Sequence, residues 1–526
     1  DLHSFPTRRS SDLHIGAAAA IVPGTAREVP HRGLITVSVM LASIMQALDN
    51  TIANVALPRI QGNLSATQDQ MSWVLTSYIV AAAIMTPLSG WLAGRFGRRK
   101  IFLFSIFGFT VASALCGLAQ SLPEIVLARL VQGLSGAALI PMSQATLLDI
   151  NPPERLGRAM TVWVMGVTIG PILGPALGGW LTEQYSWRWV FYINVPIGIL
   201  CFFGVLAFMK ETTLRLSRFD FFGFASLSLA VGSLQLMLDR GQSNDWFNDL
   251  ETWIEAGVCL TSVYLFVIHL FTTRKAPFIS PALFKDRNFL AGNFFIFMVG
   301  VVLFATLALL PPLLQNLLGY PVVLTGLVTA PRGVGTLIAM AIVGRLGNRV
   351  DGRYVMVVGL TLTAVSLWWM TNFYLQMDSN EVVWSGLLQG IGTGCVFAPL
   401  STIAFSTLMP QLRNEGTAFF SLMRNLGSSI GISVVTTLLV RNTQIMHSRL
   451  AEHVTPFSDG LTPSLSAGLQ TAEQLAHLNA AVTQQAAMIA YNNDFKLMLI
   501  LTVAAIPLVA LLRYMEIGRA SCRERV

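Results

Sequence analysis

Fourteen long apolar stretches occupy most of this 526-residue chain and decide what it can fold into. A helix needs about 20 apolar residues to cross a bilayer, and each stretch meets that length. Only 12% of the residues are charged, against roughly 25% in soluble proteins. We therefore expect an all-α polytopic membrane protein. The predicted spans are 34–57, 71–93, 101–119, 123–149, 159–182, 189–209, 221–239, 252–272, 289–312, 322–343, 354–373, 382–409, 417–440 and 495–514.

Basic residues gather in alternate loops between these spans. The loop after the second span holds Arg95, Arg98, Arg99 and Lys100, whereas neighbouring loops hold isolated arginines such as Arg188. Cytoplasmic loops carry an excess of lysine and arginine, so both termini are expected in the cytoplasm. The net charge of +7 is explained by these loops, and nucleic acid is not expected as a partner.

Both ends of the chain differ in character from the rest. Residues 1–13 and 517–526 are polar and basic and resemble translated vector sequence, so we interpret them as non-native tails. The five cysteines are odd in number and lack metal-ligand spacing. We expect neither a disulfide framework nor a metal site.

The sequence repeats itself weakly. Gly90-x-Leu92-Ala93-x-Arg95 is echoed by Gly344-x-Leu346-Gly347-x-Arg349, and Gln132-Gly133 by Gln389-Gly390, both at an offset near 255 residues. Transporters built from repeated halves place the substrate site between them. We therefore predict an N-terminal six-helix half (34–209), an insertion with two helices (210–288) and a C-terminal half (289–514) with an external loop (441–494).

Several segments together resemble one family. They are LDNTIANVALP (48–58), GWLAGRFGRRK (90–100), ARLVQGLSGAALIP (128–141), GVTIGPILGPALGG (166–179), WRWVFYINVPIG (187–198) and RNEGTAFFSLMRNLGSSIG (413–431). The chain resembles the 14-helix drug:proton antiporter branch of the major facilitator superfamily, the EmrB/QacA-type permeases. The resemblance covers nearly everything from about 34 to 514. It implies proton-coupled efflux, and a periplasmic adaptor with an outer-membrane channel as possible partners.

The first span carries Asp49 with Gln46, Asn50 and Asn54, at spacings that place them on one helical face. A carboxylate inside a span costs about 3 kcal/mol or more, so it normally faces a cavity and has a function. We expect Asp49 to bind and release a proton, in agreement with the family resemblance, and the three amides to line a substrate cavity. The alternative is that Asp49 lies near a helix end and only orients the bundle.

Arg129 in the fourth span is followed one turn later by Gln132. A buried arginine keeps its charge and must be paired or hydrated. The resemblance implies a role for Arg129 in proton transfer with Asp49, and we place Gln132 in the substrate cavity. A fixed structural ion pair is the alternative.

The loop 90–100 combines Gly90 and Gly97 with Arg95, Arg98 and Arg99. Basic groups there can pair with acids across the cytoplasmic face and hold one state. Family members usually have aspartate where this chain has Gly94, so the expected partner is missing. Glu154 or Asp220 could take its place, or the loop could be only a positive-inside anchor.

Residues 166–179 carry a stripe of small residues inside the fifth span. Such a stripe lets a neighbouring helix approach closely, while prolines soften the helix. The resemblance associates this segment with antiport, and static packing is the alternative. The members are Gly166, Gly170, Pro171, Gly174, Pro175, Gly178 and Gly179.

Arg332 and Arg424 are further charges at apparent membrane depth. They could attract an anionic substrate or meet phosphates and carbonyls near helix ends. No intramembrane catalytic set and no nucleotide-binding loop is present in the sequence, so we expect neither an enzyme nor an ATP-driven pump. The sequence predicts a secondary transporter that exports amphipathic drugs or toxic small molecules from a bacterial inner membrane, driven by the proton gradient without a cofactor. An exporter of one metabolite, such as a siderophore or amino acid, is the alternative.

Overall fold

The regular structure of this protein is helical. A computed structural model describes residues 30–152, 155–211, 218–273, 277–346, 350–454 and 472–512. Across these ranges, fourteen helical segments are long and apolar enough to cross a membrane, which confirms the predicted all-α polytopic fold. The segments 1–13 and 517–526, and Glu154, lie outside the described ranges.

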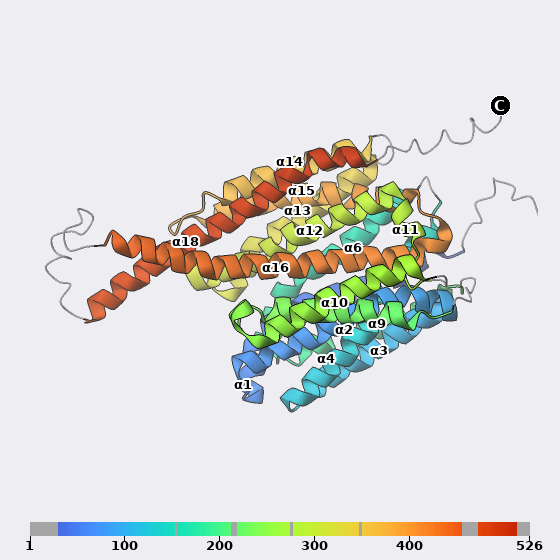
Figure 1. Cartoon of the computed structure of the whole chain (residues 1–526), viewed down its shortest axis with the longest axis horizontal. Coiled ribbons are helices and arrows are strands. Elements are labelled where there is room, and N and C mark those ends of the chain that lie inside the picture. The colour runs from blue at the N-terminus through green and yellow to red at the C-terminus, as the bar shows by residue number, and fades with distance from the viewer. Residues whose placement is uncertain are drawn as a thin grey trace, which may run out of the picture. The chain divides into compact units, whose positions relative to one another are not determined.

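Figure 1 shows the long helices running side by side. The N-terminal half and the insertion contain α1 (Arg32–Leu64), α2 (Gln68–Phe96), α3 (Arg98–Leu118), α4 (Leu122–Gly136), α5 (Leu139–Ile150), α6 (Leu156–Gln184), α7 (Trp189–Tyr192), α8 (Asn194–Phe208), α9 (Phe221–Arg240) and α10 (Leu250–Thr272). The rest contains α11 (Ala282–Lys285), α12 (Arg287–Pro312), α13 (Val322–Leu346), α14 (Gly352–Met370), α15 (Ser379–Ser406), α16 (Arg413–Glu452) and α18 (Ala472–Ala505). Short turns of helix are η2 (Trp246–Asn248), η3 (Leu313–Leu317), η5 (Pro410–Leu412) and η6 (Pro507–Leu511).

The predicted fourth span, 123–149, is interrupted. Helix α4 ends at Gly136 and α5 begins at Leu139, so the backbone N–H groups at the start of α5 lack the partners of a continuous helix. The side chain of Gln46 on α1 supplies one, because its Oε1 accepts from the Ile140 N–H at 3.1 Å. A residue predicted for the substrate cavity thus supports the break in a neighbouring helix.

Helical structure extends into the segment predicted as an external loop, 441–494. Helix α16 runs on to Glu452, and α18 begins at Ala472. The two helices pack together, and His447 Nε2 lies 2.8 Å from Asn479 Oδ1. Their contact therefore continues past the apolar part of each helix.

Each half of the chain has its own apolar core. One cluster includes Ile52 on α1 and Phe191 on α7, and the other includes Leu309 on α12 and Phe495 on α18. Helices α6 and α16 join the halves, because α6 packs on both α1 and α13, and α16 packs on α2 and α5 as well as on α12 and α18.

The inserted helices lie against both halves. Helix α9 contacts α2 and α16 as well as α10. Gln235 on α9 accepts a hydrogen bond from Ser429 Oγ on α16 at 2.8 Å, and Trp246 Nε1 donates to Thr437 Oγ1 at 3.1 Å. The insertion therefore touches the helices that would move if the halves changed their contact.

Candidate functional site: a buried ion pair and a contact between the halves

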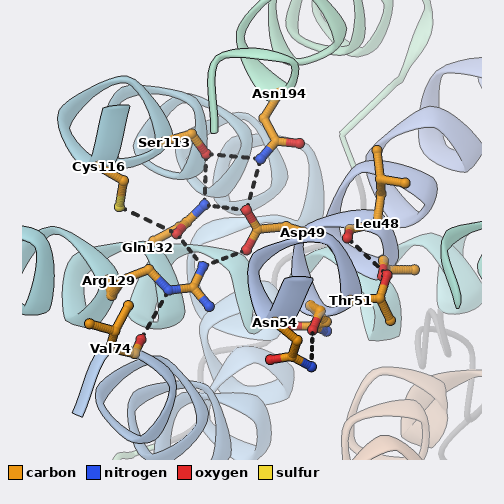
Figure 2. A network of polar contacts seen from close by, with 12 residues as sticks. Leu48, Asp49, Thr51, Asn54, Val74, Ser113, Cys116, Arg129, Gln132 and Asn194 are labelled. Atoms are coloured by element: carbon orange, nitrogen blue, oxygen red, sulfur yellow. Dashed lines mark hydrogen bonds and ion pairs between the residues drawn. The ribbon is translucent and has the colours of Figure 1, made fainter. Parts of the chain in front are cut away.

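Asp49 on α1 and Arg129 on α4 form an ion pair inside the N-terminal half (Figure 2). Arg129 Nη1 lies 2.7 Å from Asp49 Oδ2, and the two side chains are 1% and 0% exposed. Arg129 Nε also donates to the Val74 carbonyl at 3.2 Å, and its guanidinium lies 4.2 Å from the ring centre of Tyr78. A buried ion pair persists only when its remaining polar groups find partners. These contacts provide them for the arginine.

The carboxylate of Asp49 has two further donors. Gln132 Nε2 donates to Asp49 Oδ1 at 2.9 Å, and Asn194 Nδ2 donates to the same oxygen at 2.8 Å. Both amides also reach Ser113 Oγ on α3, at 2.7 and 3.4 Å. Figure 2 shows these side chains converging on Asp49 from separate helices. The network thus fixes the carboxylate between α1, α3, α4 and α8.

The network provides partners for Arg129 whether Asp49 is ionised or protonated. With Asp49 ionised, Arg129 neutralises it. If Asp49 takes up a proton, the attraction between the two is lost, while Arg129 keeps the Val74 carbonyl, the Gln132 oxygen at 2.7 Å and the Tyr78 ring. The site is therefore suited to exchanging a proton against an ion pair, and the proton-coupling role of Asp49 and Arg129 stays a prediction.

The four polar residues of the first span do not share one environment. Gln46 and Asp49 are buried, whereas Asn50 and Asn54 are exposed. The Asn54 amide donates to the Asn50 carbonyl at 3.5 Å, and Figure 2 shows Asn54 turned away from the ion pair. Asp49 and Asn50 face different surroundings because residues one position apart differ by about 100° around a helix. A substrate contact for Asn50 and Asn54 stays a prediction.

The glycine stripe of α6 packs on α1, the helix that carries Asp49. A Cβ at Gly166 would overlap Met40, one at Gly170 the backbone of Ala47, one at Gly174 the Thr51 hydroxyl, and one at Gly178 would approach Ile52. Thr51 Oγ1 donates to the Gly170 carbonyl at 3.1 Å.

The other members of the stripe also lie within α6. Gly179 is buried, and α6 is helical through Pro171 and Pro175. Helix α6 also packs on α13, where the missing side chain of Gly333 leaves room for Ile172 of α6.

A second cluster of charges joins the two halves at the end of α5. Asp149 Oδ2 lies 2.7 Å from Arg98 Nη2 at the start of α3, and Asp149 Oδ1 lies 2.7 Å from Arg413 Nη1 at the start of α16. Arg98 is 3% exposed, and its Nε also donates to Asn414 Oδ1 at 3.0 Å. We call Arg98, Asp149, Arg413 and Asn414 the inter-half clasp.

The clasp contains the acid that the sequence analysis did not find. Asp220, suggested as a substitute for the missing aspartate at Gly94, instead lies 2.9 Å from His269 Nε2. Gly90 lets α2 meet the start of α16, since a Cβ there would lie 3.0 Å from the Asn414 carbonyl oxygen. Gly90 and Arg98 of the loop therefore contact the start of α16, and a gating role for the loop stays a prediction.

Gly97 forms the turn between α2 and α3 with a φ of 97°, a left-handed conformation that favours glycine. A Cβ there would overlap the Glu211 carboxylate, which accepts from the Arg99 and Lys100 N–H groups at 3.1 and 3.3 Å. That carboxylate caps the start of α3, where a negative charge is favoured. Arg95 is exposed and lies outside the clasp.

Arg332 on α13 and Arg424 on α16 are buried, with exposures of 6% and 8%. Among the described residues neither has an acidic partner within salt-bridge distance. Arg332 Nη2 donates to the Leu303 carbonyl at 3.3 Å, while its Nη1 has no hydrogen-bond partner in that part of the chain. Within the described residues, both guanidinium groups are therefore buried without a negatively charged partner.

The C-terminal half contains a neutral counterpart of the Asp49 site. Gln389 Nε2 donates to Thr306 Oγ1 at 3.2 Å, and these residues are 83 positions apart, as are Gln132 and Asp49. Gln389 follows Gln132 by 257 residues, and Thr306 follows Asp49 by the same 257 (389 − 132 and 306 − 49). The hydrogen bond is thus repeated in both halves, but only the N-terminal copy has the carboxylate.

Comparisons with known proteins agree with this architecture. The family model described as Major Facilitator Superfamily matches residues 39–432, about three quarters of the chain. The chain belongs to the major facilitator superfamily. Predicted membership is thereby confirmed, and members of this superfamily are built from repeated halves.

Two curated members of the superfamily align along nearly their whole length. The fatty acid resistance protein FarB of Neisseria gonorrhoeae is 38% identical over 484 residues, covering 90% of this chain and 95% of FarB. The multidrug export protein EmrB of Escherichia coli K12 is 37% identical over 469 residues, covering 88% and 91%.

Solved structures of the superfamily share the fold. The human organic anion transporter MFSD10 (TETRAN) superposes with a TM-score of 0.58 at 14% identity, covering 90% of this chain and 100% of that one. The proton:xylose symporter XylE gives a TM-score of 0.58 at 13% identity, covering 91% and 99%. At these identities the likeness shows the fold alone.

Sequence reasoning missed Asn194, Ser113 and Asp149. Asn194 lies within the superfamily-like segment 187–198 and is an amide in an otherwise apolar helix, which is the signal that could have identified it. Ser113 is a small hydroxyl whose importance depends on its neighbours. Asp149 is the last residue of a predicted apolar span, a position where an acidic residue does not by itself indicate a function.

Proposed function

We propose that this chain is a proton-coupled exporter of amphipathic drugs or toxic small molecules, acting by alternating access in a bacterial cytoplasmic membrane. The observation that carries the proposal is the fully buried Asp49–Arg129 pair, because an intramembrane carboxylate held by an arginine can exchange that partner for a proton. The names of the curated relatives, a multidrug export protein and a fatty acid resistance protein, support the direction and the class of cargo.

Proton binding would be coupled to transport through α1, because this helix carries Asp49 and also packs on α6. A proton entering from outside would neutralise Asp49 and loosen its hold on Arg129. Because the glycine stripe of α6 fits closely on α1, a shift of α1 would be transmitted to α6 and then to α13 in the other half. Release of the proton inside would restore the pair.

The inter-half clasp would set the state of the transporter. With both termini in the cytoplasm, as the basic loops predict, the clasp lies at the cytoplasmic end and holds the halves together there. Opening towards the cytoplasm would require Asp149 to leave Arg413 and Arg98 to leave Asn414, because these are the contacts of the clasp that cross between the halves. The described conformation is then closed on the side from which cargo is loaded.

The cargo we favour carries a negative group on an apolar body. Arg332 and Arg424 are buried without acidic partners among the described residues, and a carboxylate would satisfy them. No cofactor is required, since the proton gradient supplies about 2.3 kcal/mol per charge per 100 mV in addition to the pH difference. A periplasmic adaptor and an outer-membrane channel are proposed partners on the basis of the family resemblance.

The test is efflux from proteoliposomes that contain the purified chain, against a panel of anionic, neutral and cationic amphipaths. Transport should depend on an imposed pH gradient and stop when a protonophore removes it. Export that continues without a gradient would contradict proton coupling. Export confined to one metabolite would favour the narrower exporter instead.

A further inference from the structure

Asp494 on α18 is a buried carboxylate without a partner. The residue is 1% exposed, and among the described residues neither carboxylate oxygen has a hydrogen-bond partner. Asp49 is equally buried but has a guanidinium and two amides around it. An isolated ion in such a place is strongly unfavourable, so a lone buried carboxyl group is stable only when neutral.

Asp494 lies on a part of α18 whose neighbouring residues belong to an apolar core. Tyr491, Phe495 and Met498 on the same helix belong to the core cluster of the C-terminal half, together with Val435 on α16 and Leu313 on η3. Tyr491 lies one turn before Asp494 and is the titratable group on its own face. Lys496 is exposed on another face of α18. His477, the other basic residue among the described side chains of α18, lies seventeen residues earlier, roughly 25 Å along the axis, so no described side chain of this helix neutralises the carboxylate.

Helix α16 does not bring a charge to the level of Asp494. The His447–Asn479 contact sets the register of the two antiparallel helices, so Asp494, fifteen residues after Asn479, lies level with about residue 432. Arg424 and Arg441 are then roughly 12–14 Å away along the axis, at 1.5 Å per residue, and Arg441 is exposed. The other titratable groups of α16, Arg413, Glu415, His447, Arg449 and Glu452, lie further towards its ends.

The remaining neighbours of α18 are equally without nearby charge. Asn492 Nδ2 donates to the Phe373 carbonyl at 2.9 Å, which places this part of α18 beside the end of α14. The titratable residues of α14 are Arg353 and Tyr354, at its opposite end. On α12 the first residue, Arg287, is the titratable one, and η3 and η6 contain none. No described element packed on α18 therefore offers Asp494 a cation.

We propose that Asp494 is a second proton-binding site, and that it carries a proton in the conformation described. The N-terminal half holds its carboxylate as an ion pair, whereas the C-terminal half holds Asp494 as a neutral acid. Ionisation would require water to reach α18, as when its contacts with α12, α14 or α16 open. The site's participation in antiport rests on the proposed function, but its occupation by a proton does not.

Infrared spectroscopy of the purified full-length chain tests this directly, because a protonated carboxyl group has a carbonyl stretch that a carboxylate lacks. At neutral pH the wild-type spectrum should contain such a band that is absent from Asp494→Asn and retained in Asp49→Asn. In Asp494→Glu, which keeps the group if the asparagine variant folds poorly, the band should persist at a shifted frequency. Raising the pH should remove it reversibly.

Identical carboxylic-acid regions in wild type and Asp494→Asn at neutral pH would overturn the proposal, because Asp494 would then be ionised. So would a band that never titrates while the protein remains folded, since a proton-binding site must also release its proton. Failure of the wild-type chain to show gradient-driven export would refute the proposed function and leave this spectral result unchanged.

Discussion

Asp149 binds Arg98 with one carboxylate oxygen and Arg413 with the other, at 2.7 Å each, and so joins the two halves of the molecule through a single side chain. Asp149 is 29% exposed, which leaves water access to the pair. An ion pair that water reaches, as between Asp149 and Arg413, contributes about 1 kcal/mol or less. The clasp is therefore strong enough to bias two states and weak enough to open during a transport cycle.

Asp149→Asn should shift the population towards the state that is open at the clasp end by a few-fold, because the ion pair with Arg413 across the halves is lost. Spin labels on α5 and α16 near that end should report longer distances in the variant. Gradient-driven efflux should fall several-fold, since the closed state is no longer favoured.

A matched control is Asp351→Asn. Asp351 pairs with Arg353 two residues away, at 2.8 Å, and so forms an ion pair within one half. This change should leave the distances between the halves as in wild type. Equal effects of the two substitutions would show that the clasp has no special role.

Gly170→Ala should destabilise the protein and slow transport. The added methyl group would overlap the Ala47 backbone on α1, and overpacking of this kind costs about 1–3 kcal/mol. Thermal unfolding in detergent should show a lowered midpoint.

Gly257→Ala on α10 serves as the control for that loss, because nothing lies within 4 Å of the new Cβ. Its midpoint should be unchanged or slightly raised, since alanine favours a helix. A Gly170→Ala protein as stable and active as wild type would mean that α1 and α6 are not closely fitted.

Arg332→Gln should reduce transport of anionic amphipaths selectively. A charge-assisted hydrogen bond is worth about 1.5–3 kcal/mol, so the apparent affinity for an anion should fall about tenfold or more. Neutral compounds should be transported as before. Arg345→Gln, on the same helix but exposed, should change neither class, and an equal loss for both classes in Arg332→Gln would refute an anion-binding role.

Much of the fold follows from the sequence, because in a bilayer length and hydropathy decide where helices form. Asp49 and Arg129 could be selected for the same reason, since a charge inside an apolar stretch is conspicuous. The glycine stripe predicted close packing, and the structure adds that its partner is α1.

Pairing between distant residues could not be predicted in this way. The break between α4 and α5 falls in a run of small apolar residues that hydropathy reads as one span. Asp149 acts through Arg98 and Arg413, and Asp494 is distinguished by a carboxylate that has no hydrogen-bond partner among the described residues. Such relationships depend on how helices are rotated and aligned, which a pattern along one helix does not contain.

The most direct test of the central claim is substrate transport by Asp49→Asn in proteoliposomes, with the amount of inserted protein matched to wild type. Asparagine resembles the protonated carboxyl group and cannot exchange a proton. The variant should therefore lose uphill export driven by a pH gradient while still exchanging labelled for unlabelled substrate. Gradient-driven export by Asp49→Asn at the wild-type rate would contradict the account.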